Sequence, residues 1–197
     1  IKSLWRRFLE DEKTWHLFTL APGGKRWHHA FLGGLLEHTC SVIKLADFFA
    51  RTYPAADRDL VLSGALFHDI GKVRELSYET SFDYTDEGRL LGHIVIGNEM
   101  VCNYARSIEG FPEDKLLFLR HLILSHHDDL GGSPVVSMTK EAFLLHHADR
   151  LDSQFAAVCR EIEEASAQPG GEWSGFINLL ERQLYLGRSE TSKDKER

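Results

Sequence analysis

The stretch "GGLLEHTCSVIKLADFFARTY" (residues 33–53) predicts a helical fold, because its apolar side chains recur at helical spacing. Leu35, Val42 and Phe49 are each separated by seven residues and fall on one row of a helix. A row of this kind is the buried face of an amphipathic helix. His38 lies on the same row, between Leu35 and Val42, so we expect its ring to point into the core.

Similar apolar rows continue through most of the chain. Asp57, Thr85 and Thr139 stand where N-cap residues are favoured, and Pro112 is expected at a first helical position. Only "SYETSFDY" (77–84) has weak strand character, and it is short enough for a loop or a small hairpin. We therefore expect an all-α fold, a compact helical bundle. The further predicted helices span residues 57–70, 86–109, 113–128 and 139–165.

The chain of 197 residues is long enough for one well-buried domain but not for two full ones. We expect a short amphipathic helix and a loop over residues 1–27, packed on a main domain over residues 28–165. Residues 166–197 are expected to form a C-terminal helix and a charged tail. The chain begins at Ile1 rather than at methionine, which fits a fragment of a longer protein.

The charge, the cysteine content and the length of the apolar runs limit the possible partners of the chain and its cellular compartment. The net charge of −7 would repel a polyanion, so any contact with nucleic acid must be local. Three widely spaced cysteines form neither a disulfide framework nor a thiolate zinc site, which favours a reducing cytoplasm. No apolar run reaches the length of about 18 residues that a membrane span needs. We expect a cytoplasmic protein without a membrane partner.

The segment "FHDIGK" (67–72) places two strong metal ligands where a helix should end. His68 follows Val61 and Ala65 at helical spacing, so its ring is directed into the core. Asp69 projects about 100° further around the helix. The two side chains can therefore approach one point from neighbouring directions.

Three further ligand-type residues lie on apolar rows. His93 shares the row of Leu90 and Met100, while His126 and Asp149 continue the rows of their own helices. Burial penalises each polar group that has no partner. A single histidine on an apolar face is more often a hydrogen-bonded core residue than a ligand, but convergence on metal would satisfy all of these groups together. Imidazole and carboxylate ligands suit manganese, iron, nickel or zinc, and one bridging carboxylate suggests two ions.

These motifs, taken in order, resemble a known family. "EHT" with His38, "HDIGK" (68–72), "GHIVIG" with His93, "LSHH" ending at residue 127 and "HHADRLD" with Asp149 are similar to the HD superfamily of metal-dependent phosphohydrolases. "HHAFLGGLLEHT", "TDEGRLLGHIVIG" and "LILSHHDDLGGSP" resemble more narrowly the HD domain of bacterial YhaM-type 3′ to 5′ exoribonucleases. The resemblance covers about residues 1–160, and five separated motifs make it specific.

The resemblance implies an all-α bundle of the HD-domain type and two divalent ions, with manganese as the first expectation. Asp69 would bridge the ions, and His127 would be either a further ligand or an outer hydrogen-bond donor. Asp69, His68 and Lys72 would carry the catalysis, with Lys72 on a phosphate oxygen; Lys72 could instead be a cation at a helix C-terminus. The implied ligands are His38, His68, Asp69 and Asp149 for the first ion, and Asp69, His93 and His126 for the second.

A basic and aromatic segment, "GGKRWHH" (23–29), could stack a base and contact phosphate, although a solvated loop beside a buried tryptophan is the simpler reading. Arg89 could add charge to a substrate groove or be an ordinary surface cation. The candidate substrate-binding residues are Lys25, Arg26, Trp27, His29 and Arg89.

The leading hypothesis is a phosphodiesterase that removes nucleotides from the 3′ end of single-stranded RNA or DNA. A second hypothesis is an HD phosphohydrolase that acts on a nucleotide, a cyclic dinucleotide or a signalling nucleotide. A third is a catalytically silent sensor that binds a nucleotide. YhaM-type proteins resemble a two-part design with an oligonucleotide-binding barrel ahead of the HD domain, so this chain is expected to be either a fragment or a standalone relative. A homo-oligomer is compatible with all three.

Overall fold

The computed structural model describes residues 1–25, 29–78, 82–128, 132–167, 171–178 and 180–187. It divides the chain into two compact units, Ile1–Asp152 and Ser153–Arg197. Helix α8 begins in the first unit and continues into the second. The helices are α1 (Lys2–Leu9), α2 (Glu12–Leu20), α3 (Gly34–Thr52), α4 (Arg58–Phe67), α5 (Lys72–Glu75), α6 (Asp86–Arg106), α7 (Glu113–Ser125) and α8 (Lys140–Ser166).

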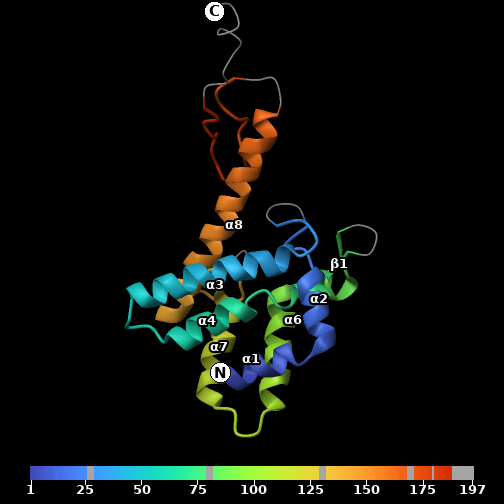
Figure 1. Cartoon of the computed structure of the whole chain (residues 1–197), viewed down its shortest axis with the longest axis vertical. Helices are drawn as coiled ribbons and strands as arrows, with labels where there is room; N and C mark the ends of the chain where they lie inside the picture. Colours follow the sequence, from blue (N-terminus) through green and yellow to red (C-terminus); the bar gives the residue numbers. More distant parts are fainter. Residues whose placement is uncertain (26–28, 79–81, 129–131, 168–170, 179, 188–197) are drawn as a thin grey trace, which may run out of the picture. The chain divides into compact units, whose positions relative to one another are not determined.

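The first unit is a bundle of helices around one apolar core, which confirms the predicted all-α class. Helix α3 packs along α4, α4 packs on α7, and α7 packs on α6 (Figure 1). Leu35 and Val42 are fully buried, as their row predicted, and Phe49 packs against the core while partly exposed. No helix in the described ranges is both long and apolar enough to cross a membrane.

The predicted helix starts are confirmed by their caps. The side chains of Asp57, Thr85 and Thr139 each accept a hydrogen bond from the backbone N–H three residues further on. These bonds satisfy donors that the first turn of a helix leaves without partners. Pro112 lies one residue before the first helical position at which it was expected, as the N-cap residue of α7, so this prediction is wrong by one residue.

Helix α6 departs from its predicted row at Gly92. The backbone of Gly92 has φ 74° and ψ 155°, so the helix is interrupted there and restarts at His93. Because the interruption changes the direction of the side chains, Leu90 does not share the buried row of Met100. Leu90 is 83% exposed, and its expected place on that row is wrong.

The N-terminal segment forms two helices rather than the one short helix expected. Helix α1 ends at Leu9 with Glu10 as its C-cap, and Asp11 caps the start of α2, since its side chain accepts a hydrogen bond from the N–H of Thr14 at 3.1 Å. Phe8 and Phe18, one from each helix, pack edge to face at 5.4 Å between ring centroids. The segment therefore contributes to the core of the first unit.

Among the described residues, β-type backbone pairing is present in two regions, one in each unit. Strands β1 (Leu76–Ser77) and β2 (Asp83–Tyr84) pair antiparallel, in agreement with the small hairpin considered for this region. In the second unit, residues 171–178 and 180–187 contain isolated bridges, Trp173 with Tyr185 and Ile177 with Arg182, and no helix. The helix expected after residue 166 is wrong for these residues, because glycines and a proline interrupt the helical row.

Candidate metal centre

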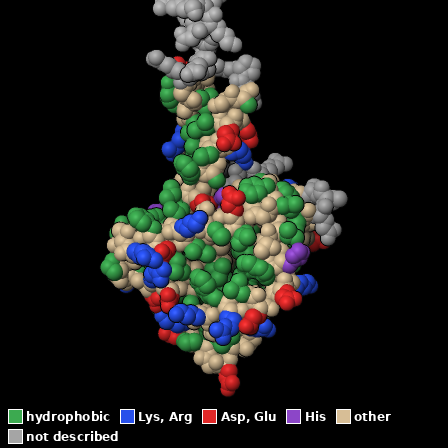
Figure 2. Space-filling view, viewed as in Figure 1, with side chains coloured by type: hydrophobic (Ala, Val, Ile, Leu, Met, Phe, Trp, Pro, Cys, Tyr) green, Lys and Arg blue, Asp and Glu red, His purple; other side chains and the backbone are tan. Residues whose placement is uncertain are grey.

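The ligand-type side chains come from five helices, α3, α4, α6, α7 and α8, and meet inside the first unit. His38 projects from α3, His68 caps the end of α4 with Asp69 directly after it, and Asp149 projects from α8. All four are at least 94% buried by their exposed fractions of 0%, 0%, 2% and 6%. Accordingly, little histidine surface shows on the face of this unit drawn in Figure 2, where apolar side chains occupy much of the middle.

The first ligand group consists of His38, His68, Asp69 and Asp149. The Nε2 atom of His38 lies 3.1 Å from Nε2 of His68 and 3.2 Å from Oδ1 of Asp149. Oδ2 of Asp69 lies 3.5 Å from Nε2 of His38 and 3.4 Å from Nε2 of His68. The four atoms thus face one small space.

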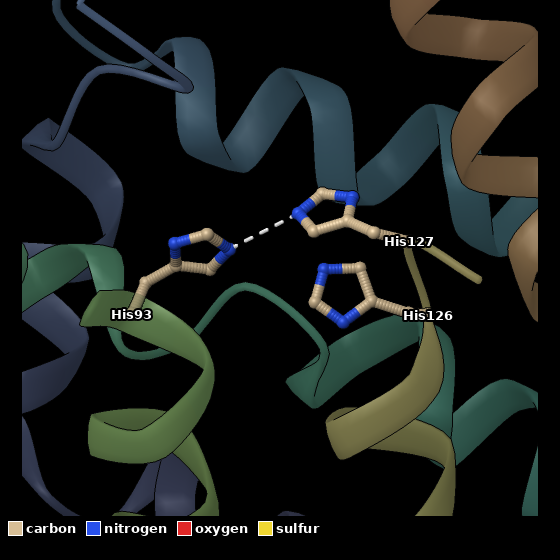
Figure 3. A group of neighbouring side chains, drawn as sticks. All are labelled: His93, His126 and His127. Atoms are coloured by element: carbon tan, nitrogen blue, oxygen red, sulfur yellow. Dashed lines mark hydrogen bonds between the residues drawn. The ribbon is translucent and has the colours of Figure 1, made fainter. Parts of the chain in front are cut away.

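The second group uses the other oxygen of Asp69. Oδ1 of Asp69 lies 3.4 Å from Nε2 of His93 and 3.7 Å from Nε2 of His126. His93 comes from α6, and His126 and His127 come from the end of α7, with their rings directed toward one another (Figure 3). Nε2 of His127 lies 3.4 Å from Nε2 of His93. The structure thus brings His127 to the second group.

The spacing of these atoms fits divalent cations. Ligand atoms about 2.1 Å from a common ion lie roughly 3.0 Å apart in octahedral and roughly 3.4 Å apart in tetrahedral geometry. Oδ1 of Asp69 and Nε2 of His126 are buried and make no hydrogen bond. Buried polar atoms without partners are rare in folded proteins, and a cation between them would satisfy both.

The charges of the centre are already arranged for cation binding. Burial would raise the pKa of the Asp69 carboxyl, but the charges of Lys72 and His68 and hydrogen bonds from His38 and His68 hold it well below its usual range. The pKa of Asp149 is likewise lowered, against burial, by His38 and His68. Burial lowers the pKa of His126 well below its usual range, so its ring stays neutral. The centre therefore offers carboxylates together with a neutral imidazole.

Backbone carbonyls fix two of the rings. Nδ1 of His68 lies 2.9 Å from the carbonyl oxygen of Ala65, and Nδ1 of His126 lies 2.8 Å from that of Ile123. A carbonyl oxygen only accepts, so Nδ1 must carry the proton in each ring. In the neutral form of each ring, which a bound cation requires, the Nε2 lone pairs of His68 and His126 are thereby directed into the centre.

The carboxylates of Asp152 and Glu75, which the sequence did not single out, fix the rings of His38 and His93. Oδ2 of Asp152 accepts from Nδ1 of His38 at 2.7 Å and from Nε2 of His29 at 2.9 Å. Oε1 of Glu75 accepts from both Nδ1 and the backbone N–H of His93, each at 3.0 Å. The spacing of three residues between Asp149 and Asp152 was a usable signal, because it places both on one helix face.

Glycine is required at residue 71 for close packing rather than for a turn. The backbone of Gly71 has φ −63° and ψ −19°, which any residue adopts. A Cβ atom at this position, however, would lie 2.0 Å from the carbonyl oxygen of His93. The missing side chain therefore lets α6 approach the segment that carries Asp69, and so brings His93 to the centre.

Lys72 lies inside the protein. Its Nζ atom donates to the carbonyl oxygen of Gly23 at 2.6 Å and forms an ion pair with Oδ2 of Asp69 at 2.6 Å. The side chain is 8% exposed, whereas His93 and His127 are exposed by 17% and 33%. Lys72 thus stands on the buried side of Asp69, and its contact with a substrate phosphate stays a prediction.

The candidate substrate-binding residues fall into separate places. Lys25 and Arg89 both form ion pairs with Oδ1 of Asp83, at 2.8 and 3.0 Å, and both lie over the ring of Tyr84. His29 is bonded to Asp152, as described above. Arg26 and Trp27 lie outside the described residues.

The chain is similar to proteins of one known family. Residues 35–154 match the HD domain family. The chain is 41% identical over 167 residues to a protein named 3′-5′ exoribonuclease YhaM from Bacillus subtilis (strain 168), which covers 83% of this chain and 51% of that protein. Proteins of the same name from Bacillus licheniformis and Shouchella clausii are 42% and 36% identical, over 83% and 88% of this chain and 52% and 54% of theirs.

The chain spans about half the length of these relatives. No solved structure matches it significantly. The family match extends over more than half of the chain and includes every side chain of both ligand groups. The chain therefore belongs to the HD domain family.

Proposed function

We propose that the first unit is a metal-dependent phosphodiesterase that removes nucleotides from the 3′ end of single-stranded RNA. One observation carries the chemistry: the two oxygens of the buried Asp69 carboxylate face two different groups of histidines. A carboxylate in this position can hold two cations side by side. Two neighbouring cations are a recurrent device for hydrolysis of phosphodiesters.

In this proposal His38, His68, Asp149 and Oδ2 of Asp69 hold the first ion, and the second group holds the other. When bound, such ions supply a water of lowered pKa and neutralise charge on the phosphoryl oxygens. The ligands of the second ion are Oδ1 of Asp69, His93, His126 and His127.

The chain's own residues keep the centre in position. Lys72 stabilises the Asp69 anion through their ion pair, so the bridging carboxylate is charged before any ion arrives. Asp152 and Glu75 orient the rings of His38 and His93. The exposed edges of His93 and His127 mark the side from which a phosphodiester can reach the centre.

The choice of RNA and of exonucleolytic action comes from the relatives, which are named as 3′-5′ exoribonucleases. We propose manganese as the ion, because histidine and carboxylate ligands without thiolate suit it. We also propose that the protein acts in the cytoplasm.

A time course on a 5′-labelled single-stranded RNA oligomer with added manganese tests the proposal. The account predicts a descending ladder of labelled products and release of nucleoside 5′-monophosphates. Chelation should stop the reaction, and addition of manganese in excess of the chelator should restore it. Thin-layer chromatography of the mononucleotides identifies the products.

The same assay separates the proposal from its rival. An RNA oligomer that remains intact, while a mononucleotide or cyclic dinucleotide is hydrolysed, would replace the exonuclease with a nucleotide phosphohydrolase. No hydrolysis of any phosphoester with manganese would leave only a binding role.

Metal binding should weaken as the pH falls. Burial would lower the pKa of His38, but hydrogen bonds to Asp149, Asp152 and Asp69 raise it well above its usual range. Without a bound ion the ring is therefore protonated at neutral pH, and manganese must displace that proton. The affinity is expected to fall about tenfold per pH unit for each proton released.

Isothermal titration of manganese at pH 8 and pH 6.5, in buffers with different ionisation enthalpies, measures both the affinity and the released protons. The account predicts at least one proton released per chain. An unchanged dissociation constant with no proton release would contradict the assignment of His38 as a ligand.

A further inference from the structure

We propose that the cleft beside His93 binds the nucleoside of the 3′-terminal nucleotide, the one that leaves as a monophosphate. This inference rests on the proposed function and deepens it. The cleft is lined by residues of α6 and of the loop before α8. The lining residues that matter for binding are Glu75, Leu91, His93, Val95, Ser133 and Pro134.

The burial of the ligand side chains determines the side from which a substrate can reach the centre. His38, His68 and His126 are fully buried, so a substrate cannot reach the ions past them. His93 and His127 are the ligand-group members with exposed edges among the described residues. A phosphodiester at the centre must therefore lie beside His93 and His127. The nucleoside attached to that phosphate then enters the cleft beside His93.

The loop wall of the cleft is joined directly to the centre. Oγ of Ser133 accepts a hydrogen bond from the backbone N–H of His127 at 3.1 Å. His93 forms part of the opposite wall and is held there by Glu75. The distance from the centre to the cleft is thus fixed by short local contacts rather than by a long side chain.

The size and walls of the cleft suit one nucleoside. Its volume is about 380 Å³, near the lower end of the roughly 300–1,000 Å³ typical of small-molecule sites. Leu91 and Val95 are 49% and 41% exposed although they are apolar, and Pro134 is also exposed. Apolar side chains of this kind can contact the faces of a base by van der Waals packing without hydrogen-bonding its edges, as a sequence-tolerant exonuclease needs.

A negatively charged side chain in the cleft disfavours binding of a further phosphate group there. Apart from His93, Glu75 is the one ionisable side chain among the described lining residues. The Oε1 atom of the Glu75 carboxylate accepts hydrogen bonds from Nδ1 and from the backbone N–H of His93, each at 3.0 Å, so this acidic group is held in the wall of the cleft. An anion in the cleft would be repelled, whereas a neutral base and the hydroxyl groups of a ribose would not.

Equilibrium binding tests the inference without requiring turnover. The probes are adenosine 5′-monophosphate and methyl phosphate, each titrated into the manganese-loaded protein. The phosphates are alike, so the ratio of the two dissociation constants isolates the contribution of the nucleoside. We expect adenosine monophosphate to bind at least about tenfold more tightly, as contact with an apolar site of this size allows.

The double variant Leu91→Ser/Val95→Thr should bring that ratio close to one and leave methyl phosphate binding unchanged. Leu90→Ser is the matched control, since Leu90 is the neighbouring residue on α6, is 83% exposed and does not line the cleft. It should keep the wild-type ratio.

Equal binding of the two probes by the wild-type protein would overturn the inference, and so would an unchanged ratio in the double variant. A nucleoside preference in a protein that does not degrade RNA would instead keep the cleft and overturn the exonuclease. The two failures are therefore distinguishable.

Discussion

Asp69→Asn is expected to lower manganese-dependent hydrolysis of RNA by about a thousandfold or more. Loss of a hydrogen-bond partner behind a metal ligand already costs roughly 10- to 100-fold, and Asp69 is a ligand shared by both groups. The amide nitrogen of asparagine cannot bind a cation. Initial rates on the labelled RNA oligomer measure the loss.

The loss of activity in Asp69→Asn must be distinguished from a loss caused by unfolding. Asp69→Asn leaves Lys72 buried without its main counter-charge, and breaking a buried ion pair costs about 3–5 kcal/mol of stability. Asp69→Asn/Lys72→Met removes both charges and should regain stability, measured by thermal unfolding, but not activity. Near-wild-type hydrolysis by either variant in its folded form would refute the bridging role of Asp69.

Gly71→Ala should have the second largest effect, on both stability and the second ligand group. The added Cβ would lie 2.0 Å from the carbonyl oxygen of His93 and 2.7 Å from the backbone nitrogen of Gly97. Both are backbone atoms, so α6 must move away as a unit. We expect a loss of at least about 2–3 kcal/mol in the free energy of unfolding, which is typical of overpacking.

His93 should move away from Asp69 together with α6, so a folded Gly71→Ala protein should bind one manganese ion less. Gly175→Ala is the control, because a Cβ there meets nothing within 4 Å and Gly175 has no positive φ. If the free energy of unfolding and the number of bound ions are the same in both variants, close packing at Gly71 does not position the centre.

Much of the fold and of the ligand set could be predicted because both follow from one-dimensional spacing. The row that contains Leu35 and Val42 predicted α3, similar rows predicted the other main helices, and the positions of His38 and Asp149 on such rows predicted that they point inward. Short-range periodicity determines the direction of a side chain as long as the helix continues. The ligand set converges in space for that reason.

Residue spacing does not predict the direction of a side chain beyond a point where its helix is interrupted. It also does not predict contacts with a partner in another helix or loop. Gly92 interrupts α6, and no row predicts how far the interruption rotates Leu90 out of the core. The pairing of Glu75 with His93 and the bond from Lys72 to Gly23 depend on how α5 packs against α6 and the N-terminal loop. Such contacts exist only in the folded unit.

The number of manganese ions bound per chain shows whether the Asp69 carboxylate bridges two ions. After equilibration with manganese and removal of the free ion, elemental analysis gives the stoichiometry, and electron paramagnetic resonance shows whether the ions are neighbours. The account predicts two magnetically coupled ions in the wild-type protein and at most one in Asp69→Asn. A single ion in the wild-type protein, or two undiminished ions in the variant, would contradict a centre bridged by Asp69.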